Sequence, residues 1–160
     1  MARSTFSGPI KSGTSRYNPY KNVGTTVLTQ GTSFSVTAAG TTTNTFYLPA
    51  GSQILTIHFD TTTAFTGGTG AVTVGNVASG TQYAPSTTVT TGARAVPTYT
   101  ATQLTNMLST PVDVSSGTNG NNGAVSAIAV TLVAGTGVTA GALTATITYI
   151  QTQTDTFANS

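Results

Sequence analysis

Threonine accounts for 38 of the 160 residues, and this feature restricts the possible folds more than any other. Its branched β-carbon limits χ1 and favours the pleated conformation of a strand, while its hydroxyl keeps an outward face wettable without charge. Charged residues make up only 5% of the chain, against about 25% in an average globular protein. The sequence therefore predicts sheets whose outer faces carry threonine in place of lysine and glutamate.

Apolar residues occupy every second position in several segments after Thr25, which is the pattern of a half-buried strand. Gly31 and the 39–41 turn separate the first segments and predict hairpins between successive strands. Segments 128–133 and 143–149 form the clearest predicted hairpin. The alternating apolar positions include Val27, Phe34, Val36, Phe46, Leu48, Val72, Val74, Ile128, Val130, Leu132, Leu143, Ala145, Ile147 and Tyr149.

Two further patterns refine this prediction. In segment 53–60 the alternation places Leu55, Ile57 and Phe59 on the core face and His58 on the other face. Leu104, Met107 and Leu108 follow the spacing of one helical turn, but Pro111 and the threonine-rich flanks limit its length. Helix is therefore expected to be a minor component.

Eight or more short strands with Gly, Pro and Asn turns indicate an all-β fold, expected as a jelly-roll-like β-sandwich or barrel. A chain of this length fits one domain, which we predict as a β-sandwich body at 25–151. An extended basic N-terminal arm at 1–24 precedes it, and a C-terminal tail at 152–160 follows. The polar stretch 115–123 is expected at a loop tip.

The basic charge is concentrated in the predicted arm. Four of the five basic residues fall within the first 21 positions, where no acidic residue occurs, so the arm is +4. Arg94 and three aspartates leave the remainder at −2, since 1 − 3 = −2. Such asymmetry suggests an anionic partner. The arm's basic and aromatic residues are Arg3, Phe6, Lys11, Arg16, Tyr17, Tyr20 and Lys21.

Three roles are open for this arm: binding nucleic acid, remaining a solvated tail, or docking on a protein. Basic residues interleaved with aromatics can contact phosphates and stack on bases. Four charges spread over 21 positions, however, give only a modest salt-dependent affinity for nucleic acid. We therefore expect a protein-docking arm and no nucleic-acid partner.

Candidate catalytic and metal sites are sparse. His58 and Asp60 form the only His–carboxylate pair at close spacing, but no nucleophile motif accompanies them. Two ligands are also fewer than a metal site usually needs, and the chain has no cysteine. The Gly67–Gly70 stretch lacks the Lys-Ser/Thr of a phosphate loop and is predicted to be a hairpin turn. We expect no enzyme activity, metal or cofactor.

Sugars and membranes are two other kinds of partner. Tyr83, Tyr99 and Tyr149 could line a sugar-binding surface, although tyrosines in strands are more often packing residues. The opening MARSTFSGPIKSG lacks the apolar stretch of a secretory signal, and no window approaches the length of a membrane span. We expect no membrane partner and synthesis in a cytosol.

Several short motifs resemble those of tailed-phage head proteins. A Leu48-Pro49-Ala50-Gly51 corner leads into a strand, then a Thr63-Ala64-Phe65 loop and a Thr73-Val74-Gly75 strand. Segment 139–143 and the following Ile147-Thr148-Tyr149 are similar to the closing strand of that pattern. The opening Ser4–Ser12 also resembles the start of small virion proteins of marine and cyanobacterial phages.

The resemblance implies a capsid decoration, or cement, protein: a β-rich virion protein that binds the outside of the head and bridges neighbouring major capsid proteins. It implies synthesis in the host cytoplasm, a location on the capsid exterior, and a homo-oligomer, expected as a trimer. The alternative is a head-fibre or host-surface glycan-binding module. The expected capsid-docking residues are those of the arm, Arg3, Phe6, Lys11, Arg16, Tyr17, Tyr20 and Lys21.

Overall fold

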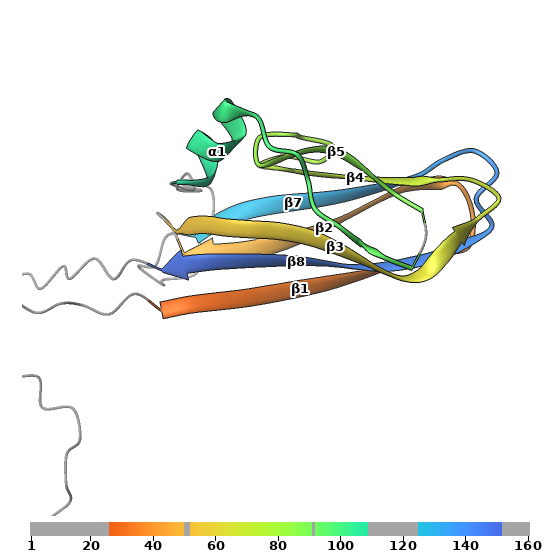
Figure 1. Cartoon of the computed structure of the whole chain (residues 1–160), viewed down its shortest axis with the longest axis horizontal. Coiled ribbons are helices and arrows are strands. Elements are labelled where there is room, and N and C mark those ends of the chain that lie inside the picture. The colour runs from red at the N-terminus through yellow and green to blue at the C-terminus, as the bar shows by residue number, and fades with distance from the viewer. Residues whose placement is uncertain (1–25, 50–51, 91, 109–124, 152–160) are drawn as a thin grey trace, which may run out of the picture.

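The computed structural model describes residues 26–49, 52–90, 92–108 and 125–151 as two antiparallel four-stranded sheets packed face to face (Figure 1). The expected all-β sandwich is thus confirmed. The predicted arm, the 115–123 loop and the C-terminal tail lie outside the described residues. The strands are β1 (Thr26–Val36), β2 (Gly40–Pro49), β3 (Gln53–Thr66), β4 (Gly70–Gly75), β5 (Ala84–Val89), β6 (Arg94–Ala95), β7 (Val125–Ala134) and β8 (Ala140–Gln151).

Strands that follow one another along the chain mostly lie in opposite sheets. The first sheet, here called sheet A, has the order β1-β8-β3-β6, and sheet B has the order β2-β7-β4-β5. The predicted hairpins between β1 and β2 and between β7 and β8 are therefore wrong. Alternation decides which face of a strand is buried, and two strands can share a buried face across the core as well as side by side.

Gly31 was predicted to separate two strands, and this too is wrong. It lies in the middle of β1, which pairs with β8 from Thr26 to Val36 without any shift in register. Its backbone is extended, with no positive φ. Glycine alone is therefore not a sufficient turn signal inside an alternating segment.

A β-bulge in β3 corrects the predicted core face. The register with β8 shifts between Ile54 and Thr56, so the residue between them is inserted into the strand. Leu55, predicted to face the core, is consequently 48% exposed, while Ile54 is buried. Beyond the bulge the prediction is confirmed, because Ile57 and Phe59 are completely buried.

The core lies between the two sheets and consists of the inward side chains of both. Each fully buried Leu, Ile, Val or Phe side chain stabilises the fold by about 1.5–3 kcal/mol relative to leaving it exposed. The buried hydrophobic side chains include Phe34, Phe46, Leu48, Ile57, Phe59, Val72, Val74, Tyr83, Ile128, Val130, Leu132, Leu143, Ala145, Ile147 and Tyr149.

The predicted helical turn is present as α1 (Ala101–Met107). Thr100 caps the helix. Its hydroxyl accepts a hydrogen bond from the backbone N–H of Gln103, and the side-chain oxygen of Gln103 accepts one from the backbone N–H of Thr100 at 2.9 Å. This reciprocal capping box satisfies two otherwise unpaired donors. The side chain of Met107, the last residue of α1, is buried, and that of Leu104 faces solvent.

The two ends of the sandwich differ. Thr26 at the start of β1 lies opposite Gln151 at the end of β8, so both terminal segments leave from the same end. We call this the terminal end; it also holds the end of β2, the starts of β3 and β7, and α1 (Figure 1). The opposite end, here the turn end, is formed by the connections 37–39, 67–69 and 135–139.

Two of these connections pack tightly against each other at the turn end. The Gly135 N–H donates to Thr69 O at 2.9 Å, and the Thr139 N–H donates to Thr66 O at 2.9 Å. Gly67 has φ +80°, and a β-carbon there would collide with the Gly137 carbonyl. The Gly67–Gly70 stretch is therefore a tight connection from sheet A to sheet B, and its prediction as a hairpin turn is wrong.

Candidate docking surface

Asp60 and Arg94 carry the only formal charges among the described residues, and they neutralise each other. The Arg94 Nε and Nη2 atoms donate to the two Asp60 carboxylate oxygens at 2.7 and 2.9 Å. The strands β3 and β6 place them directly opposite each other. The hydrogen bonds from Arg94 hold the pKa of Asp60 below its usual value, and the positive charge of Arg94 adds to this effect.

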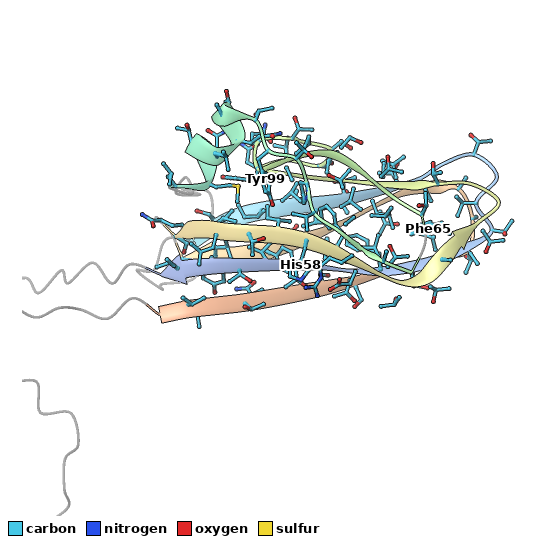
Figure 2. All side chains as sticks on the ribbon, in the orientation of Figure 1. His58, Phe65 and Tyr99 are labelled. Carbon is cyan, nitrogen blue, oxygen red and sulfur yellow. The ribbon has the colours of Figure 1, made fainter. Side chains whose placement is uncertain are left out.

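His58 lies on the outer face of sheet A beside this ion pair, as the alternation predicted (Figure 2). Its Nε2 is 3.5 Å from Asp60 Oδ2, and its side chain is 17% exposed. The Asp60 carboxylate already accepts two hydrogen bonds from the Arg94 guanidinium, so its main partner is Arg94 and not His58. Across the described residues there is no group of three or more His, Cys, Asp or Glu side chains that could hold a metal ion.

Sequence reasoning missed Arg94 as the partner of Asp60. The two residues are 34 positions apart, and β6 is only two residues long, too short to show alternation. A signal was nevertheless available. Arg94 is the only basic residue after position 21, and a lone cation in a body this poor in charge is a natural partner for a strand aspartate.

Hydroxyl groups cover the outer face of sheet A. The central strand β8 turns Thr144, Thr146 and Thr148 outward as half-buried side chains. The Thr148 hydroxyl hydrogen-bonds the Thr29 hydroxyl at 3.4 Å, and the Thr144 hydroxyl bonds Ser33 at 3.1 Å. These cross-strand bonds give the face polar partners without charge, as the threonine content predicted.

Exposed apolar side chains gather at the terminal end. Val27 of β1 is 57% exposed, and Leu55 stands out from the bulge of β3. Tyr47 near the end of β2 is 62% exposed. The helix α1 and its C-cap add Leu104 and Leu108. These residues come from both sheets and the helix, so apolar surface is distributed around the end from which the terminal segments leave.

The seven residues predicted to dock on a capsid lie outside the described residues. Arg3, Phe6, Lys11, Arg16, Tyr17, Tyr20 and Lys21 all precede Thr26. The described structure locates the point where they join the body, which is the start of β1 at the terminal end.

The three tyrosines considered for sugar binding are packing residues. Tyr83 and Tyr149 are buried, and burial raises the pKa of Tyr83. Tyr99 lies between α1 and β3 (Figure 2), where its hydroxyl donates to Ile57 O at 3.0 Å and accepts from Ile57 N at 3.1 Å. Burial raises the pKa of Tyr99, partly offset by the Ile57 hydrogen bond. These side chains are unavailable to line a sugar groove.

The helix of the described residues is too short to cross a membrane. No protein-family model matches the chain, and no curated protein matches it. Among solved structures, a chain of the "Cyanophage Pam1 capsid asymmetric unit" aligns with a TM-score of 0.46 and 19% identity. The alignment covers 91% of this chain and 100% of that chain.

Proposed function

We propose that this protein is a structural component of a phage virion, a capsid decoration protein that binds the outer surface of the head. The observation that carries the proposal is the electrically neutral surface of the described residues, on which the only two formal charges, Asp60 and Arg94, pair with each other. A free protein with so little charge has little colloidal repulsion. Such a surface suits a subunit that spends its life packed in an assembly.

The strand order supports the same proposal. Sheets ordered β1-β8-β3-β6 and β2-β7-β4-β5 follow the two-Greek-key wrapping of a jelly roll. Viral capsid domains use this architecture, although lectins and cupins use it as well. The fold is therefore compatible with a virion role, and the neutral surface favours that role over an independent soluble one.

The position of the arm suggests how attachment works. An extended arm of about 24 residues reaches on the order of 80 Å. In the proposed mechanism, the arm's cations pair with carboxylates of the major capsid protein and its aromatics fill shallow pockets. The exposed apolar residues Val27, Leu55 and Leu108 at the terminal end then face the shell beside the root of the arm. One arm could in this way bridge neighbouring capsid subunits.

Direct examination of purified particles tests this function. Mass spectrometry of gradient-purified virions should detect the chain in many copies per particle, and protease added to intact particles should cleave it. An antibody against the body should label the outside of heads. Absence from purified particles, or a protein protected inside the shell, would contradict a decoration role.

A further inference from the structure

The strand β1 forms an edge of sheet A, and no other described strand pairs with it on its outer side. At 11 residues it is the longest of the described edge strands, and its pairing with β8 is regular throughout. Its sequence, TVLTQGTSFSV, contains no charged residue and no proline. Proteins commonly protect edge strands with lysine, proline, bulges or covering loops, because unpaired backbone groups recruit other strands.

The opposite edge of the same sheet has the protection that β1 lacks. There the Tyr99 hydroxyl occupies both backbone groups of Ile57, in the manner of a paired strand. The Thr61 N–H donates to Ala93 O at 3.2 Å, and the Phe65 N–H donates to Thr90 O at 2.9 Å. In sheet B, the edge strand β5 is short and contains a proline.

The direction of the unpaired groups on β1 follows from one side-chain contact. Asn44 Nδ2 of β2 donates to Ser33 O at 3.2 Å, so the Ser33 carbonyl points away from β8. In a regular antiparallel strand, alternate residues turn both backbone groups to the same side. The outward set is therefore Val27, Thr29, Gly31, Ser33 and Ser35. Ser33 O keeps a second lone pair for another donor.

Gly31 lies at the centre of this outward set, and its own subunit does not require it. A β-carbon there would make only ordinary contacts, the nearest at 3.7 Å from Thr144 Cγ2. Its φ is not positive, and β1 has no bulge. A mid-strand glycine weakens a strand, and it often marks a place where another backbone approaches closely.

We propose that β1 pairs antiparallel with β1 of a second copy about a two-fold axis at Gly31, joining the two A sheets into one. A two-fold contact must be self-complementary, and this register satisfies that condition. Thr29 lies opposite Ser33 on the outer face, and Leu28 lies opposite Phe34 on the core face. The outward set then exchanges about ten backbone hydrogen bonds without any like-charge repulsion.

This pairing does not depend on the virion role, and it differs from the trimer that the resemblance to phage head proteins implies. Repeating a two-fold contact at one site produces a pair and no larger ring. A trimer would have to use a different surface of the body. The mass of the protein in solution and a cross-link at Gly31 therefore separate the two arrangements.

A cysteine at Gly31 tests the register, because the chain has no cysteine of its own. At the axis the two Cα atoms would lie about 5.5 Å apart, within the range that a disulfide spans. Full-length Gly31→Cys should form a covalent dimer under mild oxidation. Ser35→Cys is the matched control, since the two copies of that residue would lie about 26 Å apart. Equal cross-linking of both variants, or none in Gly31→Cys, would overturn the proposal.

Charge placed on the edge provides the second test. In Thr29→Lys/Ser33→Lys, lysines lie opposite lysines across the axis and should weaken the dimer about 10- to 100-fold, measured by sedimentation of the full chain. Ser86→Lys/Thr88→Lys places the same charges on exposed positions of β5 and should leave the dimer intact. A monomeric wild type, equal effects of both variants, or a trimeric mass without the Gly31→Cys cross-link would each contradict the β1 pairing. If the Thr29→Lys/Ser33→Lys variant fails to fold, the comparison of Gly31→Cys with Ser35→Cys still tests the β1 pairing.

Discussion

The described part of the body has no net formal charge, because its two charged residues, Asp60 and Arg94, are opposite in sign and pair with each other. On the outer face of sheet A, the Arg94 guanidinium donates a hydrogen bond to each of the two Asp60 carboxylate oxygens. The pair lies at the surface, so solvent screens it and its contribution to stability is modest. Its main effect is to fasten the two-residue strand β6 to the edge of β3.

The stabilisation by this pair should depend on pH. Arg94 lowers the folded-state pKa of Asp60 below the ordinary value of 3.8, so the stabilisation is complete above 3.8 and is lost as the pH falls through the folded-state pKa. Arg94→Ala should therefore melt slightly below wild type near neutral pH, and the two melting curves should converge in acid. A gap that stays constant down to about pH 2 would show that Arg94 acts through packing instead.

The bulge in β3 can be tested with one aspartate at each of two neighbouring positions. Ile57→Asp buries an unpaired charge and should destabilise the body by several kcal/mol, on the order of 3–5. Leu55→Asp, at the exposed bulge position, should change the free energy of unfolding by less than about 0.5 kcal/mol. Denaturant melts of both variants measure the contrast. Similar losses would mean that Leu55 faces the core.

At the scale of elements, β3 is protected along an edge where it has few strand partners. Tyr99 substitutes for a neighbouring strand by pairing with Ile57, and the 90–93 segment supplies further acceptors. Without this cover, sheet A would have two long open edges. Among the described residues, one edge of sheet A is therefore protected, and no strand pairs with β1 at the other edge.

Removing one hydroxyl tests this cover. Tyr99→Phe leaves both backbone groups of Ile57 without their partner and should cost about 1–3 kcal/mol of stability. Amide exchange at Ile57 should accelerate at the same time. Tyr47→Phe, at an exposed tyrosine of β2, is the matched control and should leave stability unchanged within about 0.5 kcal/mol. Equal stability of the two variants would show that the hydroxyl contributes nothing to the edge.

Alternation in the sequence predicted the all-β class, the longer strands apart from the continuity of β1, and most of the buried face, because burial repeats every second residue. It could not predict strand partners, since Phe34 and Phe46 bury the same kind of surface whether their strands pair or face each other across the core. The bulge at Leu55 also leaves no trace in an apolar run. Contacts between distant segments, such as Arg94 with Asp60, depend on the finished topology.

At the scale of the whole molecule, the two ends of the sandwich have different roles in the proposed function. The turn end is closed by tightly packed connections around Gly67 and Gly137. The terminal end carries exposed apolar side chains and the points where the chain continues beyond Thr26 and Gln151. Attachment at the terminal end would leave the turn end directed away from the shell.

The arm should contribute to binding without contributing to the fold. Its predicted residues precede β1 and supply no described strand, so deletion of residues 1 to 24 should leave the melting of the body nearly unchanged. Raised salt should weaken binding of the intact protein only in part, because salt screens the cations and leaves the aromatic contacts. Complete loss of binding in high salt would indicate an attachment made by charge alone.

The most direct test of the virion proposal is a binding measurement on heads that lack the protein, with the intact chain and the chain without residues 1 to 24 added in parallel. The proposal predicts that the intact chain binds with saturation and raises the temperature at which heads release their genome. The truncated chain should be folded, yet bind far more weakly and protect far less. Failure of the intact chain to bind heads would contradict the decoration role itself. Equal binding and protection by both chains would keep that role but contradict attachment through the arm.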